Sequence, residues 1–159
     1  MDKLLKLMLE GEALSTQQMG EVLGISKEEL AKELKSLAEA GVLLGWRPVI
    51  NPDVDQSVVR AAIELRITPD RDGGFDKLAQ RVSKFDEVES CYLMSGAFDL
   101  LIFVKAKSLR DVASFVYEKL ATINGVTSTA THFFLRTYKQ QGFLIEQAAS
   151  DGEKLNYSP

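Results

Sequence analysis

Cysteine and histidine are almost absent from this sequence: its 159 residues include one of each, Cys91 and His132. A single cysteine excludes an internal disulfide, and so few thiol and imidazole ligands argue against a zinc cluster within one chain. No run of about eighteen apolar residues is present, so no segment is predicted to span a membrane. The N-terminal segment is amphipathic and includes acidic side chains, unlike a signal peptide. We therefore expect a cytoplasmic protein without metal or membrane segment.

Catalytic groups at recognisable spacing are missing as well. The sequence has no paired carboxylates, nucleophile with a base, glycine-rich phosphate loop or metal-ligand set in a known pattern. His132 stands beside Phe133 in a predicted strand, where a packed or interface residue is a simpler interpretation than a general base. The sequence therefore predicts a protein that is not an enzyme and needs no cofactor.

An excess of positive charge is also missing, and the charges are unevenly distributed. The net charge is −4, with six basic and ten acidic side chains in residues 1–59 and twelve basic and ten acidic in residues 60–140. Binding to nucleic acid depends on neutralising phosphates with lysine and arginine. The composition of residues 1–59 therefore argues mildly against a nucleic-acid partner.

Two capping boxes, Ser15-x-x-Gln18 and Ser26-x-x-Glu29, are the most informative pattern that the sequence does contain. In each box the serine side chain satisfies an amide of the first helical turn, and the Gln or Glu side chain reaches back to the serine amide. Gly24 stands between the boxes, where the first helix must end in a left-handed residue. The pattern predicts a helix, a tight turn and a second helix.

Helical periodicity sets the limits of these elements. The two capped helices are predicted over about 15–23 and 26–40, and a shorter helix that ends near Gly11 precedes them. Val22 is expected to point inward with its neighbours on the first capped helix. Such a helix-turn-helix commonly places its second helix in the major groove of DNA.

The residues after these helices change in character. Segments 42–47 and 49–50 are rich in apolar side chains and predict two short strands, which would form a wing beside the helix-turn-helix. Pro52 and the polar residues that follow it indicate a linker. We therefore expect a winged helix-turn-helix domain over residues 1–51 and a linker over 52–57.

From residue 58 onward, segments in which apolar residues recur every second position, as in strands, take turns with segments of helical periodicity. The order βαββαβ predicts a ferredoxin-like sandwich over 58–139, followed by a polar tail over 140–159, so the whole chain is expected to be α+β. The predicted elements are a strand over 58–67, a helix over 75–85, strands over 88–94 and 98–106, a helix after Ser108 with Leu109 on its buried side, and a strand from 126 to about 138.

The strand that includes residues 100–104 is apolar on both of its faces. Helices cover only one face of a ferredoxin-like sheet, so the other face is expected to meet a second sheet. An apolar side chain that stays in water forgoes roughly 1.5–3 kcal/mol, and several together favour association. We predict a homodimer formed through this domain.

Several motifs of the two predicted domains occur together. They are Met19-Gly20-x-x-Leu23-Gly24-Ile25-Ser26, the segments 37–46 and 88–99, Gly125-Val126 and Ser128-Thr129-x-Thr131. In combination, over about residues 2–139, they resemble the leucine-responsive regulator/AsnC (Lrp/AsnC, feast/famine) family. The resemblance implies a transcriptional regulator with a winged helix-turn-helix and an amino-acid-sensing (RAM-type) domain. It also implies pairing as dimers, often built into tetramers or octamers, on double-stranded promoter DNA.

The resemblance further implies an amino acid or related metabolite as effector, bound between subunits. Residue by residue it points to Gly96, Asp99, Ser128, Thr129 and Thr131. The chemistry is suitable, because glycine allows close approach of the backbone, a carboxylate can receive an ammonium group, and hydroxyls can bind a carboxylate. The alternative is structural: Asp99 could hold its turn and the threonines could simply favour a strand.

The predicted reading helix departs from the family, which commonly has arginine where Glu33 stands here. Its outward face carries two lysines and three glutamates, so one head should bind DNA weakly and depend on avidity across an oligomer. The alternative function is an oligomeric metabolite sensor or protein-interaction regulator that does not bind DNA, with a degenerate helix-turn-helix. The expected DNA contacts are Lys27, Lys32, Lys35, Ser36 and wing residue Arg47.

Overall fold

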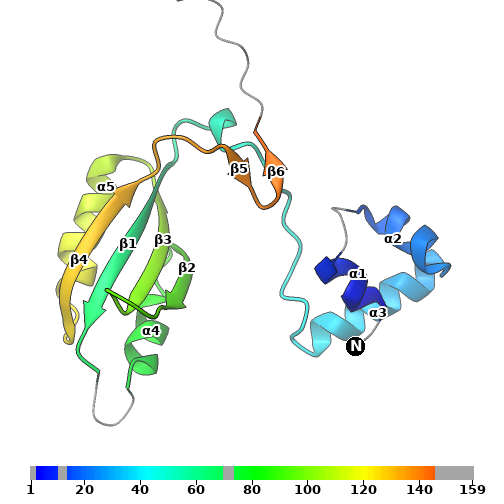
Figure 1. Cartoon of the computed structure of the whole chain (residues 1–159), viewed down its shortest axis with the longest axis horizontal. Coiled ribbons are helices and arrows are strands. Elements are labelled where there is room, and N and C mark those ends of the chain that lie inside the picture. The colour runs from blue at the N-terminus through cyan, green and yellow to red at the C-terminus, as the bar shows by residue number, and fades with distance from the viewer. Residues whose placement is uncertain (1–2, 11–13, 70–73, 146–159) are drawn as a thin grey trace, which may run out of the picture. The chain divides into compact units, whose positions relative to one another are not determined.

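The computed structural model describes residues 3–10, 14–69 and 74–145. The chain divides into two units, residues 1–48 and residues 49–159, which are described one at a time. Figure 1 labels the elements of both.

The N-terminal unit contains the three expected helices, α1 (Lys3–Glu10), α2 (Thr16–Leu23) and α3 (Lys27–Glu39). Both capping boxes are confirmed: the amides of Ser15 and Ser26 donate to Gln18 and Glu29 at 2.8 and 2.9 Å, and both serine hydroxyls accept in return. Gly24 ends α2 at φ 67°, the left-handed conformation that the sequence predicts. The local sequence therefore determines where each helix begins and ends.

The core of this unit is small. Leu4, Met19 and Leu30, one from each helix, are buried, with partly buried apolar side chains around them. Gly20 lies where α2 approaches the turn, since a Cβ at this position would meet the Ile25 carbonyl oxygen at 3.4 Å. Val22 was expected to point inward, and that prediction is wrong: 62% of it is exposed. Among the described residues, α2 contributes Met19 to the buried core of this unit instead.

The predicted wing is also wrong for this single chain. The amides of Val42 and Leu43 both donate to the Leu37 carbonyl and finish α3, but residues 43–50 pair with no strand among the described residues. Pro48 has no amide to donate, and an isolated two-stranded hairpin gains little stability in water. Within the predicted linker, Pro52–Val54 forms one turn of 3₁₀ helix.

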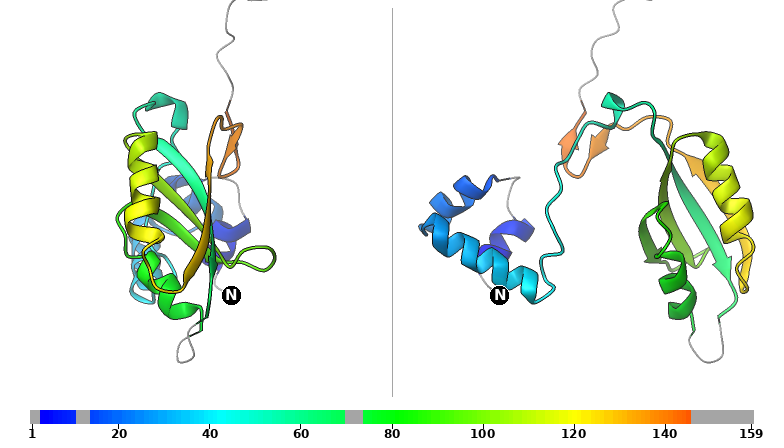
Figure 2. Two further views of the ribbon diagram at one scale, coloured as in Figure 1. Left: turned by 90° about the vertical axis from the view of Figure 1, so that its left-hand side faces the viewer. Right: turned by 180° about the vertical axis from the view of Figure 1, so that it is seen from behind.

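The C-terminal unit has the predicted order βαββαβ. Four strands form one antiparallel sheet in the order β2-β3-β1-β4. Helices α4 and α5 cover the same face of this sheet (Figure 2). The elements are β1 (Val59–Ile67), α4 (Asp76–Val82), β2 (Val88–Leu93), β3 (Leu100–Ala106), α5 (Leu109–Ser114), a π-helical segment (Phe115–Leu120) and β4 (Val126–Phe133).

Strand register separates the side chains of the sheet into two sets. Ile63 of β1 lies opposite Ile102 of β3, and both are fully buried beneath the helices. The neighbouring pair, Glu64 and Leu101, therefore points to the other side, which no element of the described chain covers. We call this side the open face. Its members are Arg60, Ala62, Glu64 and Arg66 of β1, Ser90 and Tyr92 of β2, Leu101, Phe103 and Lys105 of β3, and Ser128, Ala130 and His132 of β4, with Phe134 beyond them.

Three details of this unit differ from the predictions. Strand β4 ends at Phe133, earlier than expected, and a hairpin of β5 (Lys139–Gln140) and β6 (Phe143–Leu144) follows at the start of the predicted polar tail. The hairpin turns through Gln141 and Gly142, both at positive φ, as a two-residue hairpin turn requires. Leu109 is exposed, because α5 buries Val112 instead. The remainder of the predicted tail, residues 146–159, lies outside the described residues.

Candidate functional site

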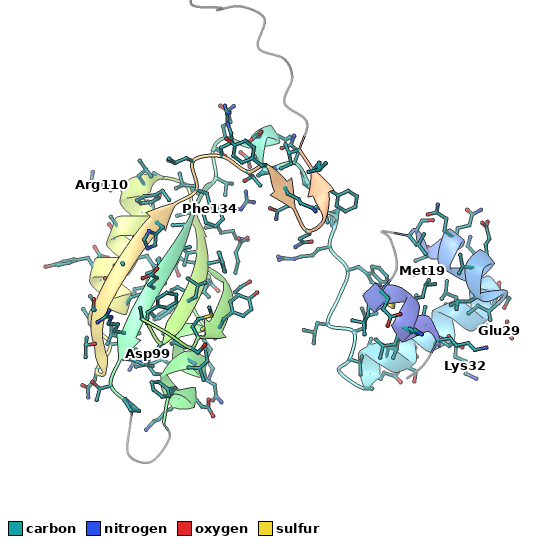
Figure 3. The ribbon with its side chains drawn as sticks, in the orientation of Figure 1. Met19, Glu29, Lys32, Asp99, Arg110 and Phe134 are labelled. Atoms are coloured by element: carbon teal, nitrogen blue, oxygen red, sulfur yellow. The ribbon has the colours of Figure 1, made fainter. Side chains whose placement is uncertain are left out.

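Helix α3 carries four of the five predicted DNA contacts. Lys27 is its first residue, and Lys32, Lys35 and Ser36 follow at spacings that bring the last three to neighbouring positions on its exposed surface. In Figure 3, Lys32 projects outward, whereas Met19 points between the helices. Arg47 is exposed on the irregular segment after α3, so the structure does not bring it to the helix as part of a wing.

The negative charge on α3 is partly engaged locally. The Ser26 amide donates to Glu29, and this bond lowers the pKa of the Glu29 carboxyl. Glu39 lies 3.7 Å from Lys35, both largely exposed, so water screens that ion pair. On the outward surface of α3, Lys35 therefore stands beside Glu39, and Lys32 stands one turn from Glu28 and from the capping carboxylate of Glu29.

Asp99 closes the loop between β2 and β3. Its carboxylate Oδ2 accepts a hydrogen bond from the Ile67 amide at 2.8 Å, and its own amide donates to the Leu65 carbonyl at 2.9 Å. These bonds hold the loop against β1 where the register between β1 and β4 shifts, between Arg66 and Ile67. Asp99 therefore has a structural partner, as the alternative interpretation of the sequence expects. Gly96 in the same loop is exposed at φ 125°, with open space around its Cα.

The three predicted effector hydroxyls on β4 lie on different faces. Thr129 and Thr131 are opposite Leu65 and Ile63, so they point to the helix side of the sheet. Ser128 is opposite Arg66 and belongs to the open face. A single subunit therefore does not gather these hydroxyls into one cluster.

A hollow of about 680 Å³, which the sequence patterns did not predict, lies beside α4. Its cationic side chains, Lys77 and Arg81, are one helical turn apart, and the apolar side chains of Leu78 and Ile123 also line it. The spacing of these two cations on a predicted helix was the signal that could have identified it. The remaining lining residues are Thr68, Gly74, Asn124, Gly125, Val126 and Thr127.

This hollow lies at the same end of the sheet as Asp99. The Thr68 amide donates to the Gly125 carbonyl at 2.8 Å, which joins the end of β1 to the turn before β4. The Thr127 hydroxyl donates to the Arg66 carbonyl at 3.0 Å, at the register shift itself. Polar groups that can bind a small molecule are thus concentrated at the end of the sheet where β1 ends and where β3 and β4 begin.

Aromatic side chains run across the open face. The rings of Tyr92 and Phe103 are 6.0 Å apart, and Phe103 and Phe134 are also 6.0 Å apart, both in edge-on geometry. Asp99 and Phe134 lie at opposite ends of the sheet (Figure 3). The aromatic row therefore crosses the open face, and Phe134 lies at the end of the sheet opposite Asp99.

The described part of the chain has neither a group of metal-ligating side chains nor a helix of the length and apolar character needed to cross a membrane.

Comparison with known proteins gives consistent matches across the chain. The family model for the Lrp/AsnC ligand binding domain matches residues 60–144. The HTH-type transcriptional regulator YugG of Bacillus subtilis is 35% identical over 99% of this chain and 95% of its own length. The proline dehydrogenase transcriptional activator of Rhizobium radiobacter is 29% identical over 88% of this chain and 90% of its own length.

Solved structures have the same fold. A Neisseria meningitidis transcriptional regulator in complex with L-methionine aligns with 88% of this chain and 93% of its own, at a TM-score of 0.63 and 23% identity. Escherichia coli AsnC aligns with 90% of this chain and 97% of its own, at a TM-score of 0.62 and 20% identity.

Proposed function

This chain belongs to the Lrp/AsnC family of transcriptional regulators, which are not enzymes, and we propose that it regulates transcription as an oligomer whose binding to promoter DNA responds to an amino acid or related metabolite. One observation carries the proposal. A capped helix-turn-helix precedes, in the same chain, a βαββαβ domain that matches the family's ligand-binding domain.

Helix α3 is the proposed DNA-reading element. Lys27, Lys32 and Lys35 contact phosphates, and Ser36 reaches a phosphate or a base edge. Arg47 contributes from the segment that follows α3. The nearby glutamates weaken each contact, so stable binding requires several heads on one DNA molecule.

A mobility-shift titration on the promoter of its own gene, repeated over a salt series, tests DNA binding. We expect binding at low salt that weakens steeply as salt rises, and a shallower salt dependence for Lys32→Ala with Lys35→Ala. Lys6→Ala on α1 is the matched control, because Lys6 is an exposed lysine of the same unit on a different helix. No shift at micromolar protein would contradict the proposal in its DNA-binding form.

A second copy of the chain covers the open face in this proposal. Leu101, Phe103 and Tyr92 form an apolar centre there, while α4 and α5 occupy only the opposite face. Burial of such side chains favours association by roughly 25 cal/mol for each Å² of apolar surface removed from water. Sedimentation of the purified protein across a dilution series should therefore detect a dimer.

We propose that the effector binds at the end of the sheet that carries Gly96, Asp99 and the hollow. Thr129 and Thr131 approach a ligand from the helix side of β4, and Ser128 approaches it from the other. Arg81 supplies a cation for a carboxylate, while the free oxygen of Asp99 accepts from an ammonium group. Because the β4 hydroxyls diverge, a neighbouring subunit completes the site.

Thermal unfolding with a panel of amino acids and their keto-acid precursors tests this site. A ligand that binds only the folded protein raises the melting temperature. We expect Arg81→Ala and Thr131→Ala to reduce that increment, whereas Arg110→Ala, at the opposite end of the sheet in Figure 3, leaves it unchanged. For Asp99→Asn, only the rise in melting temperature that the ligand causes is compared with that of the native protein. The melting temperature without ligand is expected to fall in this variant, because loss of the charge weakens the bond to the Ile67 amide.

The charge on α3 favours one second candidate, a metabolite sensor that acts without DNA. Glu28, Glu29 and Glu33 on a helix meant to approach phosphates are the observation behind it. A ligand-induced stabilisation of the protein, together with no mobility shift at low salt, would select this function.

A further inference from the structure

A contact between a histidine and a carboxylate joins two strands in the middle of the open face. His132 Nε2 of β4 lies 3.2 Å from Glu64 Oε1 of β1, and the two side chains are 58% and 34% exposed. His132 is the one histidine of the whole chain. The pair lies diagonally across the strands, because His132 is directly opposite Ala62 and Glu64 is directly opposite Ala130.

The surroundings of Glu64 leave His132 as its close cationic partner. On β3, the residue opposite Glu64 is the apolar Leu101, and Phe103 lies one position along the same face. On β1, Arg66 is exposed two residues beyond Glu64 on the same face. On β4, Ser128 and Ala130 carry no charge.

The other charges of the open face form a separate group at the far end of β1. Arg60 of β1 and Lys105 of β3 lie 3.8 and 3.4 Å from Glu89 of β2. Both cations are thus engaged with a different carboxylate.

Covering this face would remove water from the Glu64 carboxylate. A buried carboxylate is strongly unfavourable unless it is paired, and a charged partner forms a much stronger hydrogen bond than a neutral one. A histidine titrates near pH 6.5, so its charge can change within the ordinary range of cellular pH.

We propose that dimerisation through the open face takes up a proton at His132, so that the dimer is tighter at pH 6 than at pH 8. The proposal rests on the second copy described under the proposed function. Its sign follows from linkage: the contact between His132 and Glu64 already exists in one chain, and a carboxylate that loses its water in the dimer favours the protonated imidazole beside it more strongly. The added affinity between subunits is complete below the ordinary histidine pKa. It disappears as the pH rises through the higher pKa that this side chain has in the dimer.

Sedimentation equilibrium of the full chain at pH 6, 7 and 8, at constant ionic strength, tests this directly. We expect a dissociation constant roughly tenfold or more lower at pH 6 than at pH 8, because a one-unit change in pKa is a factor of ten in each subunit. His132→Gln and Glu64→Gln should both abolish the difference between the two pH values. Glu118→Gln, an exposed carboxylate on the helix side, is the matched control and should retain it.

The single histidine provides a second measurement. Its Cε1 proton gives one imidazole signal in the NMR spectrum, so its titration needs no assignment among several. At concentrations that favour the dimer, we expect its midpoint at a higher pH in the native chain than in Glu64→Gln.

The outcomes separate the two proposals. A dimer with the same dissociation constant at pH 6 and pH 8, or with an unchanged pH dependence in His132→Gln, overturns the switch and leaves the dimer standing. A chain that remains a monomer at every pH overturns both.

Discussion

The two units of this chain reach a folded state by different means. Among the described residues, the C-terminal unit has a core cluster of twelve buried residues, whereas the core cluster of the N-terminal unit has three. Burial of apolar surface is the main favourable term in folding, so the C-terminal unit draws its stability chiefly from its core. The N-terminal unit relies more heavily on two capping boxes and a glycine turn, each worth about 1 kcal/mol.

The difference follows from what each unit must present to its surroundings. Of the residues of α3, only Leu30 is buried, which leaves most of the helix surface exposed, as the proposed contact with DNA requires. The sheet of the C-terminal unit needs just one covered face to be stable, and its other face is available for a partner. Substitutions in the two units should therefore differ in how far they lower the free energy of unfolding and in how much of the chain they unfold.

The largest effect is expected at the centre of the C-terminal core. Ile102→Ala removes a fully buried side chain of β3 on the side covered by the helices and should lower the free energy of unfolding by about 2–5 kcal/mol. Urea denaturation followed by circular dichroism measures the loss. Ile102→Val is the graded control, with an expected loss of about 1 kcal/mol. Equal losses for the two variants would show that the site collapses around the deletion.

A somewhat smaller loss in the N-terminal unit should have a wider consequence. Leu30→Ala is expected to remove about 2–4 kcal/mol from a core in which, among the described residues, only two other side chains are buried. The helices of this unit should then unfold while the sheet persists. Amide NMR signals of residues 16–39 would collapse, and those of 59–67 would stay dispersed. Loss of both sets together would contradict the independence of the units.

Two glycines sharpen the comparison at the level of the backbone. Gly125→Ala places a Cβ 3.2 Å from Leu78 Cδ1, at φ 98°, and should lower the free energy of unfolding by about 1–3 kcal/mol. Gly24→Ala meets no atom within 4 Å at φ 67°, so only the left-handed conformation opposes it, by about 1 kcal/mol. Thermal denaturation of both variants measures the difference. A larger loss at Gly24 would reverse the comparison.

The smallest effect concerns a charged pair on the helix side of the C-terminal unit. Burial raises the pKa of Glu87, but the hydrogen bonds from Lys119 and from its own amide outweigh this, so its pKa is lowered. Lys119→Met should cost about 1 kcal/mol near pH 7, because the Glu87 carboxylate loses its donor.

The pH dependence of that variant provides its control. A lowered folded-state pKa contributes stability above the ordinary glutamate value, and the contribution is lost as the pH falls through the folded-state pKa. The difference between native protein and Lys119→Met should therefore shrink between pH 5 and about pH 3. A difference that grows on acidification would contradict the pairing.

The sequence predicted the parts of the fold that depend on local chemistry. Ser15, Ser26 and Gly24 determine the ends of α2 and α3 through bonds within a few residues, so their pattern is readable in advance. The alternation in β1 predicted its buried and open faces, because a strand has a strict period of two, and the apolar run in β3 predicted a sheet with a second apolar face. The wing was not readable in this way, since residues 43–50 depend on a pairing partner that their own composition does not identify.

The candidate site was less predictable, because its geometry arises from contacts between distant segments. Asp99 stands far from Ile67 in the sequence, so nothing local indicates that its carboxylate binds that amide. The division of Ser128 and Thr129 between two faces follows from register, which is known only once β4 is paired. The pair of His132 and Glu64 is hidden in the same way.

Strand β1 lies between β3 and β4 in the sheet, although both follow it in the chain. During synthesis, residues 59–67 leave the ribosome with both hydrogen-bonding edges unmatched, and β4 supplies the last partner only after residue 126. The N-terminal unit can fold before the last strand of the sheet has been synthesised. A truncation before β4 would thus leave a folded head attached to an apolar strand with one bare edge, which is a template for aggregation.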